Sequence, residues 1–148
     1  MTTQQQVITR AAQGLRKSVS TTVVGESTII GPAAGVTLTK GQAVRVNAGN
    51  TTRLTDASAI NTANCLGLVK SDTAIGFAPE IERETLQLAN WTSLTGSAAL
   101  TPGARYFADP TTPGSLTSTV PGTGCIVSIG LALTADTLNI EISDPILL

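Results

Sequence analysis

The chain has 148 residues, a formal net charge of −1 and no histidine, and only 13% of its residues are charged. The near-neutral charge excludes the general electrostatic attraction by which basic proteins bind nucleic acids or anionic membranes. The absence of histidine removes the commonest general base and the commonest metal ligand. We therefore expect no nucleic-acid partner, no membrane partner, no cofactor and no enzymatic activity.

Large side chains are scarce in this sequence. Aromatic residues make up 3% of it, namely Phe77, Trp91, Tyr106 and Phe107. Each of them would bury about 150–250 Å², so the core is thin and a lone monomer would be marginal. Small domains commonly gain burial by forming homo-oligomers. We expect the chain to associate with itself, with a homotrimer as the first choice.

Residues 1–30 are expected to form an N-terminal arm and a first strand. The arm carries Arg10, Arg16 and Lys17, and no acidic residue precedes Glu26. These cations make a local basic segment in a slightly acidic chain, and a merely solvated terminus is the alternative interpretation. The arm is therefore a candidate for contact with a partner.

The conformation of residues 3–20 stays open at this point. Apolar residues there recur at helical spacing, whereas Gly14 and the β-branched residues after Ser18 disfavour a helix. No charged segment followed by an apolar stretch opens the chain, which predicts no secretory signal. We expect the chain to fold in the cytoplasm.

Residues 31–148 are expected to form an all-β domain that contains an internal repeat. Short motifs recur in order, 62 or 63 residues apart: Leu38-Thr39-Lys40-Gly41 and Leu100-Thr101-Pro102-Gly103, Leu54-Thr55 and Leu116-Thr117, Gly67-Leu68 and Gly130-Leu131. Three matches at a nearly constant offset define two similar β units. Their expected bounds are about residues 36–83 and 98–142.

Each copy predicts the same succession of strands and turns. A strand follows the first glycine of the copy, and a second strand begins at the Leu-Thr pair. An apolar strand around Gly67 or Gly130 comes next, and an alternating strand closes the copy at residues 77–81 or 138–142. Residues 84–97, between the copies, predict a strand or a bulged hairpin. The pattern favours a small β-barrel or β-sandwich, and whether the units form one barrel or two stays open.

Candidate reactive groups are few. Cys65 and Cys125 lie 60 residues apart in apolar segments, a spacing that fits neither a redox pair nor a zinc site. We expect buried, reduced thiols, because free cysteine behaves as a small apolar residue.

Three carboxylates occur at alternate positions, Glu80, Glu82 and Glu84. On a strand they would share one face, where they could bind a hard cation or act as an acid–base pair. A charged, solvated strand face is the alternative. Trp91 and Tyr106 likewise have two interpretations, as core residues or as exposed anchors for a sugar.

Several segments of the chain resemble a known class of virion module. The resemblance lies in the segment from Leu100 to Pro110, in the run Pro113-Gly114-Ser115-Leu116-Thr117, in residues 127–133 and in residues 144–148. These segments are similar to β modules of tailed-bacteriophage capsid decoration (cement) proteins and of some fibre proteins, over about the last two thirds of the chain. The resemblance implies a trimeric β-barrel or β-sandwich that sits on the capsid lattice and clamps neighbouring major capsid subunits.

The expected function is therefore capsid decoration on the virion surface, after assembly in the host cytoplasm. The absence of a long repetitive shaft or of heptads favours decoration over a fibre. The segments outside both repeats supply the expected contacts with the major capsid protein: Arg10, Arg16, Lys17, Ile146, Leu147 and Leu148. Two alternatives stay open: a head-fibre or tail-tip module that binds a receptor or glycan through Trp91 and Tyr106, and a small hydrolase that uses the three glutamates.

Overall fold

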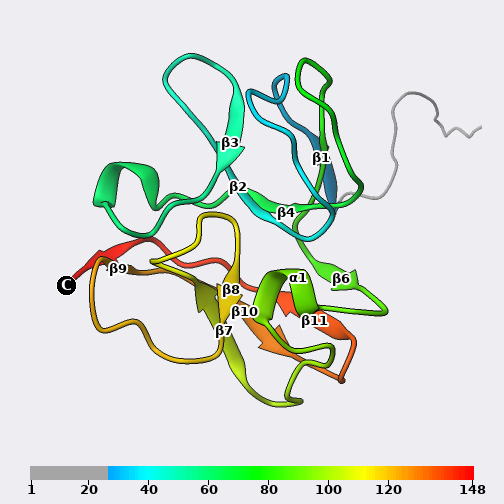
Figure 1. Ribbon diagram of the computed structural model, residues 1–148, viewed down its shortest axis with the longest axis vertical. Helices are drawn as coiled ribbons and strands as arrows, with labels where there is room; N and C mark the ends of the chain where they lie inside the picture. The colour runs from blue at the N-terminus through cyan, green and yellow to red at the C-terminus, as the bar shows by residue number, and fades with distance from the viewer. Residues whose placement is uncertain (1–26) are drawn as a thin grey trace, which may run out of the picture.

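The computed structural model describes residues 27–148, which form an almost entirely β structure (Figure 1). The strands are β1 (Thr28–Ile30), β2 (Ala43–Val46), β3 (Thr52–Leu54), β4 (Gly67–Val69), β5 (Glu80–Glu82), β6 (Thr85–Gln87), β7 (Arg105–Ala108), β8 (Leu116–Thr117), β9 (Cys125–Ile126), β10 (Ser128–Ala132), β11 (Thr137–Ile140) and β12 (Ile146–Leu147). The described helices are η1 (Ile60–Thr62) and α1 (Thr92–Thr95). The predicted all-β class is confirmed.

Two five-stranded antiparallel sheets follow one another along the chain. Their strand orders are β1-β5-β4-β2-β3 and β6-β11-β10-β7-β8, and β9 and β12 form a separate two-stranded sheet. The two orders correspond strand for strand, with β1 matching β6 and β5 matching β11. We call residues 28–82 unit 1 and residues 85–140 unit 2; Figure 1 shows unit 1 above unit 2. Both units begin earlier than the repeat bounds expected from the sequence, because each has an additional first strand.

The hydrogen bonds around the shared glycines are the same in both units. Gly41 N–H donates to the Val69 carbonyl at 2.7 Å, and Gly103 N–H donates to the Ala132 carbonyl at 2.8 Å. The Leu-Thr motif is paired differently in the two units. Leu54 pairs with Val44, whereas Leu116 pairs with Ala108, which lies two positions after the residue that corresponds to Val44. The repeat is therefore structural, with one hairpin that differs in register.

The register across the sheets is also shared. In unit 1 one row of paired residues runs from Ala43 through Leu68 and Glu82 to Thr28. In unit 2 the equivalent row runs from Arg105 through Leu131 and Asn139 to Thr85. We call these the outer rows of the two units.

Unit 1 is nearly closed into a barrel. Residues 31–35 continue from β1, and Gly31 N–H donates to the Pro79 carbonyl beside β5. Ala34 forms a parallel bridge with Thr52 in β3, at the opposite edge of the sheet. The enclosed core consists of five buried apolar side chains: Ala34, Leu38, Val44, Val69 and Ile81.

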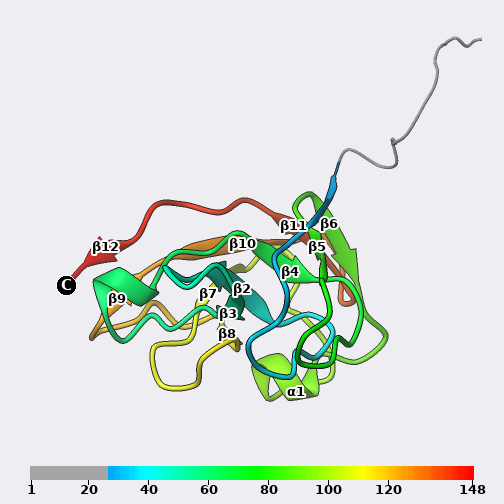
Figure 2. The ribbon, with the colours of Figure 1, turned by 90° about the horizontal axis from the view of Figure 1, so that it is seen from above.

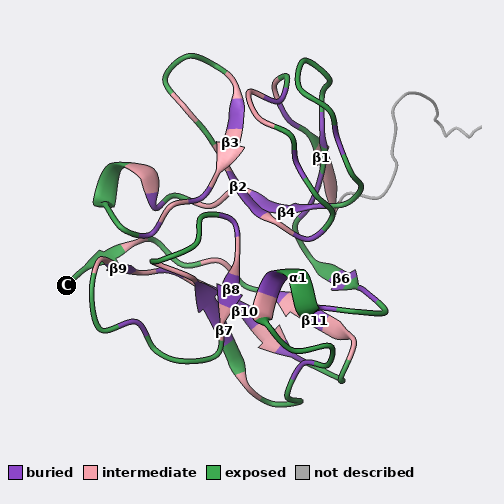
Figure 3. Cartoon of the chain, viewed as in Figure 1, coloured by how far each residue is buried: buried purple, intermediate pink, exposed green. Residues whose placement is uncertain are grey.

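The outer row of unit 1 packs against unit 2. Ala43 and Leu68 are fully buried and belong to the core cluster of unit 2, whereas their neighbours Val44 and Val69 belong to the core of unit 1. Successive strand residues point to opposite faces. One face of the unit 1 sheet therefore lines the core of unit 1, and the other face contributes to the core of unit 2. Figure 3 shows buried stretches in β2 and β4 of unit 1 and in β7 and β8 of unit 2.

Residues 84–97 contain the expected strand but not the alternative, a bulged hairpin. They form β6 and then the short helix α1, which ends at Gly96 with φ 83°. Glycine adopts this left-handed conformation without strain. The buried side chain of Leu94 holds the helix against the core.

The alternation expected over residues 77–81 is also wrong at its start. β5 begins at Glu80, and Phe77 is 68% exposed. Residues 70–79 form a long connection between β4 and β5 that folds back onto residues 31–38. Phe77 lies in that connection and not in a strand.

Candidate interaction surfaces

The C-terminal apolar residues lie outside both five-stranded sheets. β12 pairs only with β9, with Ile146 opposite Ile126 and Leu147 opposite Cys125. The side chains of Ile146, Leu147 and Leu148 are 58%, 62% and 56% exposed. The other sequence-based contact candidates, Arg10, Arg16 and Lys17, lie outside the described residues. The open question of a helix at residues 3–20 also falls outside the described residues.

A second exposed apolar surface lies on unit 1, and the sequence pattern did not predict it. Ile75 is 62% exposed, and Phe77, as noted, is exposed as well. The connection that carries them is fixed by backbone bonds: Gly76 N–H donates to the Ala34 carbonyl at 2.9 Å, and Ala34 N–H donates to the Phe77 carbonyl at 2.8 Å. These two bonds attach the connection to the backbone of Ala34. In the sequence this surface is marked only by two apolar residues, Ile75 and Phe77, on either side of Gly76.

The two aromatic anchors expected of a receptor-binding module are core residues. Trp91 is fully buried, and its indole N–H donates to the Asp136 carbonyl at 3.0 Å. Tyr106 is also buried, and its hydroxyl accepts a bond from Thr101 N–H at 3.0 Å. Neither ring is available to stack on a sugar.

The turn that accepts the Trp91 bond has a pH-sensitive carboxylate. Hydrogen bonds from Thr134, Gln87 and Thr137 lower the pKa of Asp136, with Thr134 contributing most. A carboxyl whose pKa is lowered by folding stabilises the native state above its unfolded pKa of about 3.9, and that contribution is lost as the pH falls through the folded pKa. We expect the stability of the protein to fall with decreasing pH below about 4, and Asp136→Asn to weaken this dependence. Urea unfolding between pH 3 and pH 6 measures both; identical pH profiles would contradict the assignment.

The three glutamates do not form a ladder. Glu80 is exposed, Glu82 is buried, and Glu84 lies beyond the end of β5. The Glu82 carboxylate accepts bonds from the Thr28 hydroxyl at 3.1 Å and from Glu84 N–H at 3.4 Å. Among residues 27–148, no three His, Cys, Asp or Glu side chains are placed to hold a metal ion. The buried Glu82 therefore has a structural role, since it connects β5 to β1 through Thr28.

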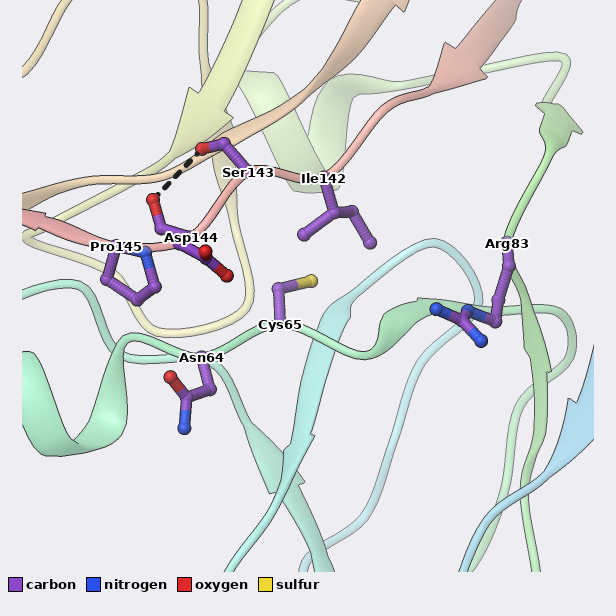
Figure 4. Close-up of a pocket in the computed structure, with 7 residues that line it drawn as sticks. All are labelled: Asn64, Cys65, Arg83, Ile142, Ser143, Asp144 and Pro145. Atoms are coloured by element: carbon purple, nitrogen blue, oxygen red, sulfur yellow. Dashed lines mark hydrogen bonds between the residues drawn. The ribbon is translucent and has the colours of Figure 1, made fainter.

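A cavity of about 310 Å³ opens beside the junction of the two units. Its lining comes from three segments of the chain: Asn64, Cys65, Arg83, Ile142, Ser143, Asp144 and Pro145. Figure 4 shows the side chains of Cys65 and Ile142 pointing toward one another, with Arg83 to one side. The lining is therefore mostly polar, with Cys65, Ile142 and Pro145 as its apolar members.

The thiol in this cavity is chemically quiet. Burial raises the pKa of Cys65 to about 11, although hydrogen bonds from its surroundings oppose the shift. The thiolate is the reactive form of cysteine, so the protonated Cys65 is a poor nucleophile at neutral pH. Cys125 is fully buried, and both cysteines are free.

We expect the native protein to resist alkylation at pH 7.5. Iodoacetamide should label Cys65 at a rate at least about tenfold below that of the urea-unfolded chain, because one pKa unit changes the thiolate fraction tenfold. Mass spectrometry after timed labelling measures the rate. Equal rates for native and unfolded protein would show that Cys65 is an accessible, ordinary thiol.

No protein-family model matches the chain, and no curated protein matches it. Within residues 27–148, no helix has the length and apolar character needed to cross a membrane.

Proposed function

We propose that this chain is a virion structural protein that binds the outer surface of a bacteriophage capsid as a homotrimer and stabilises the shell. The observation that carries the proposal is the C-terminal strand β12. Its two residues and Leu148, which follows it, are three consecutive exposed apolar residues, and β12 lies apart from both five-stranded sheets at one end of the molecule (Figure 2). An apolar strand with an open edge is suited to pairing with another chain. The likeness of residues 100–148 to decoration modules supports the same assignment.

The proposed partner is the major capsid protein, and the mechanism is mass action. A protein that binds the expanded shell, and not the unexpanded one, stabilises the expanded form by RT ln(1 + [L]/Kd) per site. Units 1 and 2 span the distance between neighbouring capsid subunits. The basic residues Arg10, Arg16 and Lys17 and the apolar residues of β12 make the contacts.

The alternative of a receptor-binding head-fibre or tail-tip module has lost its expected anchors. Trp91 and Tyr106 are both buried in unit 2. The hydrolase alternative is likewise weakened, since Glu82 is engaged by Thr28 and the backbone of Glu84. The contact residues expected for a decoration protein, Ile146, Leu147 and Leu148, are exposed.

The test is binding to expanded capsids from which decoration proteins have been stripped. We expect wild-type protein to co-sediment with them and to give ordered density at lattice threefold or quasi-threefold positions by electron microscopy. A variant with Ile146→Ser, Leu147→Ser and Leu148→Ser should bind about a hundredfold more weakly, because each side chain loses apolar burial. Deletion of residues 1–17 should also weaken binding and leave the fold intact.

Val120→Ser is the matched control, since Val120 is 60% exposed but lies outside β12. It should bind as wild type does. Full occupancy by both the triple variant and the deletion would rule out the proposed contacts. Density only at the tail or at a vertex would favour the fibre alternative.

A further inference from the structure

Two arginines of unit 1 lie directly opposite one another on adjacent strands. Arg45 in β2 pairs with Arg53 in β3, so the two side chains begin about 5 Å apart. Both lie on the outer face of the sheet, because the next pair along, Val44 and Leu54, packs in the core of unit 1. Like charges directly opposite one another destabilise a sheet. The pair therefore opposes folding unless an anion accompanies it.

No carboxylate within residues 27–148 forms an ion pair with either arginine. In that part of the chain the one ion pair joins Arg105 to Glu141. Asp56 follows Arg53 by three residues, but its Oδ1 accepts bonds from the N–H and the hydroxyl of Ser58, at 3.0 Å and 2.6 Å. The positive charge of the pair is thus not neutralised by any described side chain.

Each guanidinium group is oriented by a hydrogen bond from its Nε. Arg45 Nε donates to the Leu54 carbonyl at 3.2 Å, and Arg53 Nε donates to the Thr51 hydroxyl at 3.4 Å. The backbone at Gly35 covers the Arg53 group, since a Cβ there would lie 2.5 Å from Nε and 3.0 Å from Cζ. Both side chains are half-buried. Within residues 27–148 no hydrogen bond engages the Nη atoms of either arginine.

Guanidinium groups with unused Nη atoms are the donors that oxyanions require. The group is planar, permanently charged and matched to the oxygens of a carboxylate or phosphate, which it can bind through two parallel hydrogen bonds. A side chain that is already oriented loses less rotational freedom when a ligand binds. An oxyanion bound by both groups would also remove the repulsion between them.

We propose that Arg45 and Arg53 form an oxyanion-binding site on the outer face of unit 1, which takes a phosphate or carboxylate group. Two sources offer this chemistry, a free phosphate-type anion and an acidic side chain of a partner protein. The site itself does not depend on the proposed function. Only the second source does, with the major capsid protein as the partner.

The first test titrates inorganic phosphate into the full-length wild-type protein and follows the arginine Nε–H signals by NMR. Chloride keeps the ionic strength constant, because salt screens exposed charges. The signals of Arg45 and Arg53 should shift together and saturate with one dissociation constant of about 1–10 mM. The signal of Arg105, which already faces Glu141, should stay in place. An absence of saturable shifts, or an equal shift at Arg105, would overturn the proposal.

The second test removes the donors one at a time. Arg45→Gln and Arg53→Gln should each weaken phosphate binding at least about tenfold, because hydrogen bonds to charged groups are among the strongest. The corresponding Lys variants keep the charge but lose the planar pair of donors, so they should weaken binding less. Arg105→Gln is the matched control and should bind within about twofold of the wild type. Unchanged binding by both Gln variants would contradict the site, and the wild-type titration decides the question if a variant does not fold.

Binding to expanded capsids distinguishes the two sources. If the double variant Arg45→Gln/Arg53→Gln binds capsids more weakly and phosphate competes with the wild type, the oxyanion is an acidic side chain of the capsid protein. If the double variant binds capsids as the wild type does, the ligand is a free phosphate-type anion. A chain that binds phosphate through the pair but never binds capsids would keep the site and overturn the proposed function alone. Capsid binding without any phosphate response would do the reverse.

Discussion

Gly130→Ala should lower the free energy of unfolding by about 3 kcal/mol, at the upper end for overpacking of a well-packed site. A Cβ at this position would overlap the Asn139 carbonyl and would lie 3.2 Å from the Cα of Ile140. These are backbone atoms of β11, which pairs with β10 at Gly130. These atoms cannot move away unless the β10–β11 pairing is broken, so the overlap can be relieved only by losing backbone hydrogen bonds.

Urea unfolding compares Gly130→Ala with a matched control. A Cβ on Gly122 would meet nothing within 4 Å, and Gly122 has no left-handed φ. Gly122→Ala should therefore remain within about 0.5 kcal/mol of the wild type. An unchanged unfolding midpoint for Gly130→Ala would show that the β10–β11 approach is looser than the structure has it.

Trp91→Ala should cost about 3–5 kcal/mol, the range for removing a large aromatic side chain from a core. Trp91 is fully buried in the cluster that contains Leu138 and Leu68, so its removal affects the cores of unit 2 and of the junction together. Trp91→Phe keeps most of the apolar volume but loses the indole N–H that bonds to the Asp136 carbonyl. It should cost less, about 1–3 kcal/mol.

Thermal and urea unfolding measure both substitutions, and fluorescence gives an independent check. Trp91 is the single tryptophan of the chain, so the emission of the wild type should be blue-shifted and protected from aqueous quenchers. A red-shifted, readily quenched emission would place the indole at the surface. That outcome would revive the receptor-binding alternative.

The repeat could be predicted because backbone geometry preserved its glycines. Gly67 and Gly130 both lie against a neighbouring strand: a Cβ on Gly67 would be 2.5 Å from the Glu82 carbonyl, and Gly130 is equally restricted. A position that admits only glycine keeps its residue in both copies. A strand was expected near β1 and near β6, but neither strand was assigned to a repeat, because their sequences share no motif that marks them as equivalent.

The short helix and the exposure of Phe77 could not be predicted for a different reason. Thr92–Thr95 is too short and too rich in threonine to favour a helix by itself, and tertiary packing of Leu94 decides its conformation. Phe77 fits an alternating pattern, and an apolar residue in such a pattern is usually interpreted as core. The exposure of β12 was predictable, since Pro145 to Leu148 has no counterpart in the repeat.

The small core of unit 1 has a consequence for how this molecule depends on concentration. Five buried apolar side chains make a thin core for about 55 residues, and domains of this size are marginally stable. An isolated unit of this kind would gain stability by meeting a partner in solution. Placing two units on one chain makes that encounter intramolecular, at an effective concentration in the millimolar range. Folding of the monomer is thereby independent of how dilute the protein is, while assembly beyond the monomer keeps its concentration dependence.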